Sequence, residues 1–233
     1  MANTLRRFLK TYRGSSCPTL AELDSGGAVV VKLRGSGNGA EALASEYVVN
    51  RLAQAAGFPV PAPLIVNLAG DFPWDYGTDE FHDLVRKSAG PNLGLAVIPG
   101  ARPLPVDRYG KLAPAQVSQV VALDRTFSNW DRTDPSGNLL EDQAKQVWFV
   151  DHGSCRFLLE RDRAVLPPLP WQHSFLSRQE TFDATWLELI DDALVASVAR
   201  ELPETWLTEI RFTREELLAA IRARLRLARD AAP

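Results

Sequence analysis

Cysteine, histidine and methionine are scarce in this sequence of 233 residues. It has two cysteines, Cys17 and Cys155, one methionine, and three histidines, His82, His152 and His173. The cysteines lie far apart, and neither they nor the histidines show the spacing of a disulfide framework or of zinc ligands. We therefore expect two reduced thiols, and we expect neither a disulfide-stapled domain nor a structural zinc site.

Long apolar runs and an excess of positive charge are also missing. The sequence has no run of about eighteen apolar residues, the length that a membrane-spanning helix needs. Residues 1–7 lack the apolar stretch of a secretory signal. The net charge is −3 and the pI about 5.7, which argues against binding to nucleic acid through its phosphates. The sequence predicts a cytoplasmic protein that binds neither membranes nor nucleic acid directly.

The first hundred residues show strand patterns with one helix. The predicted strands cover residues 5–13, 18–23, 28–33, 64–66 and 93–98. A glycine-rich connection at 35–39 leads into a helix over about 40–56, whose apolar residues recur at helical spacing. Residues 69–92 are polar, acidic and aromatic, and predict an insertion loop with about one helical turn.

The rest of the chain is mostly helical. Prolines after the strand at 93–98 mark a boundary near residue 100. A helix is predicted over about 114–127, and the segments 138–140 and 147–150 predict a hairpin of short strands. Thr213 and Glu216 form the capping box that predicts the start of the last helix.

Lys32 and an acidic residue of the following helix are candidates for a nucleotide site. Lys32 ends an apolar strand just before the glycine-rich connection, where its ammonium could reach phosphates. Taken alone, it is better explained as an edge-strand lysine with its head in water. Protein kinases pair a strand lysine with a helical glutamate, and Glu46 fits that position. Glu41 competes, although an acid at a helix start also stabilises the helix dipole.

The segment 129–140 (NWDRTDPSGNLL) carries the densest set of polar candidates. Phosphoryl transfer needs one carboxylate near the acceptor hydroxyl and oxygen ligands for magnesium. Asp131 would supply the first, and Asn138 with Asp151, which follows the strand at 147–150, would supply the second. Each motif alone is as well explained by a polar turn. All of them in this order are much harder to explain by chance.

Four runs of the sequence together resemble a known family: VVVKLRG, SEYVVNRLAQAAGFPVP, NWDRTDPSGNLL and VWFVDHGS. They are similar to the small bacterial HipA-like kinases, distant relatives of the protein kinases and phosphoinositide kinases. The resemblance extends from about residue 14 to 156. It implies an α+β, two-lobed protein-kinase-like fold. Residues 1–100 would form an N-lobe of antiparallel sheet plus one helix, and residues 101–233 a mostly helical C-lobe.

The resemblance also implies roles for individual residues. Lys32 would contact the nucleotide and Glu46 would orient it. Asp131 would be the catalytic aspartate, and Asn138 and Asp151 would hold Mg²⁺. The cofactors implied are ATP and Mg²⁺.

Two further segments receive roles from the resemblance. Gly14, Ser15 and Ser16 would form the loop that covers the phosphates, although this loop has a single glycine. Val97 and Ile98 would form the hinge beside the adenine.

The sequence departs from the protein-kinase pattern at the candidate site. Asp131 and Asn138 are seven residues apart, against about five in most protein kinases. His152 replaces the usual apolar residue after the metal aspartate, and the part of the chain after Asp151 is short. These departures bear on the identity of the acceptor substrate more than on the nucleotide site.

Three functions fit these observations. The first is an ATP- and Mg²⁺-dependent kinase that acts on a hydroxyl group, Ser or Thr of a protein. The second is a catalytically silent kinase-fold module that binds nucleotide and interacts with other proteins. The third is a kinase of a small molecule or lipid head group. A protein partner that inhibits the enzyme is a further hypothesis.

Overall fold

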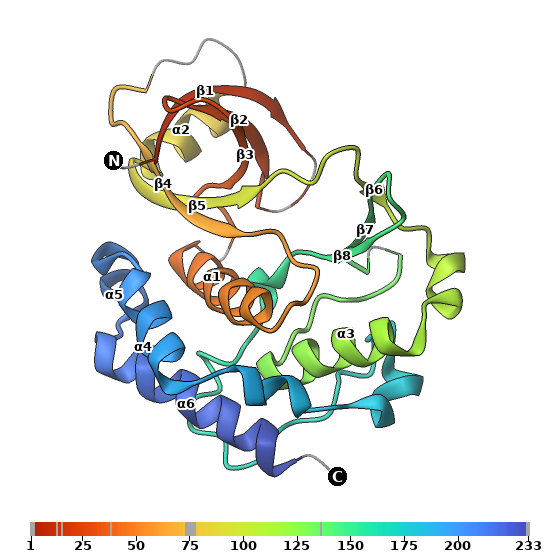
Figure 1. Cartoon of the computed structure of the whole chain (residues 1–233). Coiled ribbons are helices and arrows are strands. Elements are labelled where there is room, and N and C mark those ends of the chain that lie inside the picture. Colours follow the sequence, from red (N-terminus) through yellow and green to blue (C-terminus); the bar gives the residue numbers. More distant parts are fainter. Residues whose placement is uncertain are drawn as a thin grey trace.

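Five strands close into a β-barrel in the order β1-β2-β3-β5-β4 (Figure 1). The computed structural model describes residues 3–12, 14, 16–37, 39–72, 78–135 and 137–231. The barrel strands are β1 (Asn3–Thr11), β2 (Thr19–Leu23), β3 (Ala28–Lys32), β4 (Pro63–Leu68) and β5 (Gly90–Ala96). Each overlaps a predicted strand. The sequence predicted an antiparallel sheet, and the strands pair in this way except for β1 and β4, which pair in parallel and close the barrel.

A second helix, α2 (Asp79–Lys87), lies between β4 and β5, where the sequence predicted a loop with about one helical turn. Thr78 caps the helix by accepting a hydrogen bond from the Phe81 amide. Acidic residues occupy its first turn and basic residues its last, which suits the helix dipole. Its side chains are mostly polar, and its apolar residues Phe81, Leu84 and Val85 lie on one face and pack against the apolar cluster of the barrel. Residues 73–77 of the predicted loop lie outside the described residues.

A small antiparallel sheet follows the barrel. It consists of β6 (Arg102–Pro103), β7 (Leu139–Glu141) and β8 (Val147–Phe149). The hairpin of β7 and β8 confirms the prediction for that region, whereas β6 is too short to leave a strand pattern. Asn138, predicted to begin the first strand, lies just before β7 with a left-handed φ of 51°.

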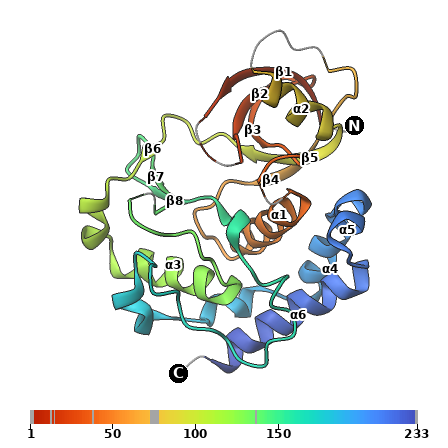
Figure 2. The ribbon, with the colours of Figure 1, turned by 180° about the vertical axis from the view of Figure 1, so that it is seen from behind.

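Helices form the other side of the molecule (Figures 1 and 2). They are α1 (Gly39–Ala55), α3 (Pro114–Phe127), α4 (Asp192–Glu201), α5 (Glu204–Ile210) and α6 (Arg214–Asp230), with short 3₁₀ helices η1 (Val106–Lys111), η2 (His152–Ser154), η3 (Leu176–Thr181) and η4 (Thr185–Leu189). The predictions for α1, α3 and the capping box of α6 are confirmed. Among the described residues, none of the helices combines the length and the apolar character needed to cross a bilayer.

The buried apolar side chains form two clusters. The smaller one fills the barrel and includes Phe8, Val31 and Val66. The larger one joins α1 and β5 to α3 and the C-terminal helices. α1 therefore lies between the barrel and the other helices, as both views show. The boundary near residue 100 remains a prediction, because the apolar packing does not divide there.

Candidate active site

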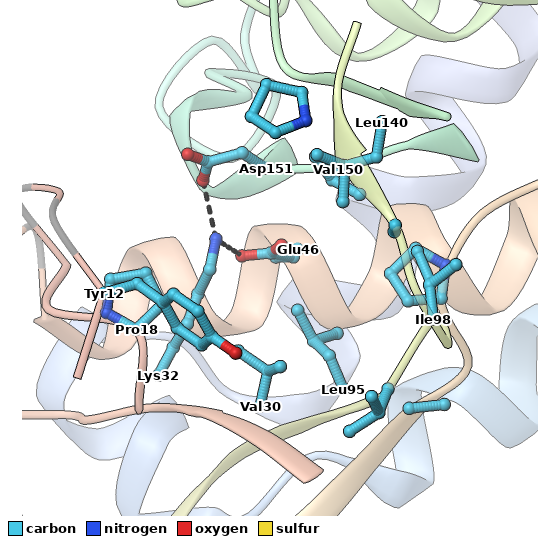
Figure 3. A pocket seen from close by; sticks show the side chains of 15 residues that line it. Tyr12, Pro18, Val30, Lys32, Glu46, Leu95, Ile98, Leu140, Val150 and Asp151 are labelled. Atoms are coloured by element: carbon cyan, nitrogen blue, oxygen red, sulfur yellow. Dashed lines mark hydrogen bonds and ion pairs between the residues drawn. The ribbon is translucent and has the colours of Figure 1, made fainter. Parts of the chain in front are cut away.

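A cavity of about 500 Å³ lies between the barrel and the small sheet (Figure 3). Val30 and Leu95 line it from the barrel, and Leu140 and Val150 line it from β7 and from the end of β8. Charged side chains gather at one end. An apolar cavity of this size with a few polar groups is typical of a small-molecule or cofactor site.

β3 brings an apolar and a charged side chain to this cavity. Because side chains alternate along a strand, Val29 and Val31 are buried inside the barrel while Val30 and Lys32 line the cavity. The alternative interpretation of Lys32 as an edge-strand lysine is wrong. β3 is hydrogen-bonded between β2 and β5, and Lys32 is only 6% exposed.

Lys32 bridges two carboxylates at the charged end of the cavity (Figure 3). Its Nζ lies 2.5 Å from Glu46 Oε2 on α1 and 2.6 Å from Asp151 Oδ1. Burial alone would lower the pKa of the lysine, but the two carboxylates raise it above its usual 10.5. Burial also opposes ionisation of Asp151, yet Lys32 holds the pKa of that carboxyl below its usual value. Glu46, and not Glu41, is thus the helical partner of Lys32.

The turn after β8 brings Asp151 close to α1. Asp151 has left-handed φ and ψ values of 64° and 60°, a conformation that aspartate adopts more readily than most residues. A side chain at Gly153 would place its Cβ 3.3 Å from Ala42 and 3.4 Å from Glu46. The glycine therefore allows the turn to pack directly against the helix that carries Glu46.

Asp131 and Asn138 are in contact despite their longer spacing. Asn138 Nδ2 donates to the Asp131 carbonyl at 3.2 Å and to Asp131 Oδ2 at 3.3 Å. Asp131 also lines a smaller cavity of about 120 Å³ together with Lys32 and Asp151. Burial, and secondly the charge of Asp151, raises the pKa of the Asp131 carboxyl. Asn138 lines neither cavity and reaches the site through its contact with Asp131.

Two loops close the smaller cavity. Ser16, from the predicted covering loop, lines it, whereas Gly14 does not, and Ser15 lies outside the described residues. The glycine-rich connection contributes Ser36 and Gly37, which the sequence analysis missed as site residues. Ser36 Oγ lies 3.0 Å from the Ser16 carbonyl and so joins the two loops. The position of Ser36 and Gly37 between a strand and the start of α1 could have indicated a role in the site, since glycine-rich loops at such positions often bind phosphate.

The predicted hinge lines the larger cavity. Val97 and Ile98 follow β5 and form part of the cavity wall. Tyr12 and Pro18, from the two ends of the β1–β2 connection, line it as well (Figure 3). No sequence pattern marked these two residues as part of the site.

His152, the residue that departs from the kinase pattern, is fully buried. Its Nδ1 lies 2.7 Å from Asn50 Oδ1 on α1, and its Nε2 lies 3.3 Å from Arg132 Nη2. Burial, reinforced by the charge of Arg132, lowers the pKa of His152 from 6.5 to about 3. The imidazole is therefore neutral at physiological pH.

Similar folds occur among solved protein kinases. The Helicobacter pylori proinflammatory kinase CtkA is similar over 99% of this chain and 97% of its own, with a TM-score of 0.63 and 12% sequence identity. The Golgi casein kinase, solved with Mn and ADP bound, is similar over 98% of this chain and 72% of its own, with a TM-score of 0.50 and 10% identity. The chain has a protein-kinase-like fold. This confirms the predicted fold class at that level.

Scans of the sequence against models of known families and against curated proteins find no match. The specific resemblance to HipA-like kinases therefore remains a prediction.

Proposed function

We propose that this protein is an ATP- and Mg²⁺-dependent phosphotransferase that acts on a hydroxyl group, Ser or Thr of a protein. The observation that carries the proposal is the position of Lys32. This lysine is buried, charged and bound to Glu46 and Asp151 at the polar end of an apolar cavity. In a protein-kinase-like fold this arrangement is the one that orients a lysine on the nucleotide phosphates.

The two cavities divide the nucleotide between them. The larger one would take the adenine between the side chains of Val30 and Leu95 on one side and Leu140 and Val150 on the other. The smaller one, which shares Lys32 and Asp151 with it, would take the phosphates under the loops at Ser16 and Ser36. The site is thus apolar for the base and polar for the phosphates.

The residues present fit a magnesium ion. Mg²⁺ prefers oxygen ligands and is usually held by one or two carboxylates together with substrate phosphates and water. Asp151 keeps a side chain that is 40% exposed, and Asn138 directs its Nδ2 to Asp131, which leaves its Oδ1 for a cation. Bound there, Mg²⁺ would neutralise charge on the phosphates. The Golgi casein kinase, solved with Mn and ADP, supports the use of a divalent cation.

Asp131 would act on the acceptor hydroxyl. Its carboxylate lines the smaller cavity, and its raised pKa suits a group that accepts a proton. The acceptor oxygen would form a bond to the γ-phosphorus while the bond from that phosphorus to the ADP oxygen breaks. The hydroxyl proton passes to Asp131, and Lys32 stabilises charge on the phosphates.

The decisive experiment incubates the purified protein with γ-labelled ATP and Mg²⁺, with and without unphosphorylated Ser- and Thr-containing peptides. Label on the protein or on the peptides supports the proposal, and Lys32→Met should abolish it. Nucleotide binding without any transfer would favour the silent module instead. Transfer only to an added small alcohol or lipid head group would favour the third function. Absence of both binding and transfer would overturn the proposal.

A further inference from the structure

Three buried polar side chains form a continuous hydrogen-bonded chain beside the ion cluster: Asn50, His152 and Arg132. All three are fully buried, with exposed fractions of 0%. His152 lies in the middle, 2.7 Å from the amide oxygen of Asn50 and 3.3 Å from the guanidinium of Arg132. Because polar groups are costly to bury unless they are paired, each of these side chains depends on its neighbours in this hydrogen-bonded chain.

The three residues of this hydrogen-bonded chain lie close in sequence to the proposed site residues. Arg132 directly follows Asp131, and His152 directly follows Asp151. Asn50 lies one turn after Glu46 on α1. The chain therefore connects the three backbone segments that deliver the carboxylates of the site.

The hydrogen-bond chemistry leaves His152 a single arrangement. A guanidinium can only donate, so His152 Nε2 must accept from Arg132 Nη2. The proton of the neutral ring is then on Nδ1, which donates to Asn50 Oδ1. The amide nitrogen of Asn50 is also used, because it donates to the Pro61 carbonyl at 3.2 Å. Each of the three side chains is thereby fixed in orientation.

Arg132 passes this constraint to the loop that carries Asp131 and Asn138. Its Nη1 donates to the carbonyls of Gly137 and Asn138, both at 2.8 Å. Its Nε and Nη2 donate to the buried carboxylate of Asp124 on α3. One guanidinium thus holds the far end of the loop against its start.

We propose that His152 is a positioning residue that sets the Asp151 turn against the loop from Asp131 to Asn138, by joining Arg132 to Asn50 on α1. This inference rests on the proposed function. An apolar side chain at this position could neither accept from Arg132 nor donate to Asn50. It would leave Asn50 Oδ1 and one N–H of Arg132 without a partner, and it would remove the side-chain link between the two segments, which would then be joined only by backbone bonds such as that from Val150 N–H to the Asn138 carbonyl at 3.1 Å.

The first test compares His152→Phe, His152→Gln and Asn50→Leu. Glutamine can accept and donate at once, so His152→Gln should retain most activity. His152→Phe and Asn50→Leu should each lower kcat and the apparent Mg²⁺ affinity by about 10- to 100-fold. The double variant should lose little more than either single one. Wild-type kcat and Mg²⁺ affinity in a folded His152→Phe protein would overturn the proposal.

Tyr47→Phe is the matched control. Tyr47 is also on α1, and its replacement by phenylalanine removes one hydrogen bond. That bond, however, joins the Tyr47 hydroxyl to Glu201 of α4, 2.7 Å away and outside the site. This variant should lose stability without a change in kcat or Mg²⁺ affinity. If it impaired catalysis as much as Asn50→Leu, the effect would be one of general stability, and the proposal would fail.

A second readout does not depend on catalysis. Amide hydrogen exchange should rise in His152→Phe in both segments that the chain joins, around residues 137–139 and 151–155, and it should stay unchanged there in Tyr47→Phe. Faster exchange confined to the mutated segment would overturn the inference. If the wild-type protein transferred no phosphate, the proposed function would fail, and the exchange data would still decide whether His152 links the two segments.

Discussion

Asn138 contacts Asp131 twice, through the backbone carbonyl at 3.2 Å and through the carboxylate at 3.3 Å. The seven-residue spacing between them therefore does not separate the two groups. Asp134, the alternative carboxylate of this loop, instead accepts a hydrogen bond from Ser174 Oγ at 2.7 Å. Of the described residues of the loop, Asp131 is the one that lines the smaller cavity.

We expect Asp131→Asn to bind ATP and Mg²⁺ with wild-type or slightly higher affinity, since a negative charge leaves the neighbourhood of the phosphates. Turnover should fall by about 10²- to 10⁴-fold, the contribution of a positioned acid–base group. Asp151→Asn should lose Mg²⁺-dependent nucleotide binding and turnover together. Calorimetric titration with ATP, combined with phosphate-transfer rates, separates the two roles.

Asp134→Asn is the control for this pair, because it removes the same charge from the same loop. It should keep full turnover. If Asp134→Asn lost turnover while Asp131→Asn kept it, the catalytic role would move three residues along the chain.

Removal of Lys32 should affect stability as well as catalysis. Lys32→Met leaves Glu46, which is fully buried, without its cation, at a cost of about 3 kcal/mol in the free energy of unfolding. Replacing both partners, with Lys32→Met and Glu46→Leu, should recover most of that loss because no unpaired charge stays buried. Neither variant should transfer phosphate. Urea unfolding and a transfer assay measure the two effects, and a double variant no more stable than Lys32→Met would contradict this prediction.

The sequence indicated which side chains lie together better than it indicated what surrounds them. The candidate residues could be proposed because residues of these types, in this order, are those that phosphoryl transfer needs: Lys32, Glu46, Asp131, Asn138 and Asp151. The structure brings Lys32, Glu46 and Asp151 into contact, and joins Asn138 to Asp131.

The parts that escaped prediction depend on tertiary packing. The barrel closes through two parallel residue pairs between β1 and β4, which leave no signal in either strand. α2 has only nine residues and few apolar side chains, so its helical pattern extends over only about two and a half turns. The role of Arg132 was invisible, because its partners Asp124 and His152 meet it only in the folded chain.

Nucleotide should stabilise the fold only together with a divalent cation. Asn138 and Asp151 offer oxygen atoms, which repel phosphate oxygens unless a cation lies between them. ATP with Mg²⁺ at about one hundred times its dissociation constant should add about 2.7 kcal/mol to the free energy of unfolding. ATP with EDTA should add much less. A melting temperature that saturating ATP with Mg²⁺ fails to raise would count against the nucleotide site.

Filling the apolar part of the larger cavity should block the base. Val150 lines this cavity and is partly exposed within it, so Val150→Phe would place a ring where the adenine is proposed to bind. KM for ATP should rise by at least about tenfold, since burial of the base is worth more than about 1.4 kcal/mol. Val165→Phe is the control, because Val165 is 69% exposed on the surface. Equal KM values for the two variants would show that the base binds elsewhere.

Acid should destabilise the fold through Asp124. This carboxylate is fully buried and accepts hydrogen bonds from Arg132, His173 and Asn129. Burial alone would raise its pKa, but Arg132 and His173 hold the pKa well below its usual 3.8. Because the folded pKa is lower than the unfolded one, the carboxylate stabilises the fold above about pH 4, and the contribution is lost as the pH falls further. Asp124→Asn should therefore be less stable at neutral pH by about 3 kcal/mol and should depend less on pH below about 4. Urea unfolding of both proteins across this range measures the difference, and parallel pH curves would show that Asp124 titrates alike in the folded and unfolded chains.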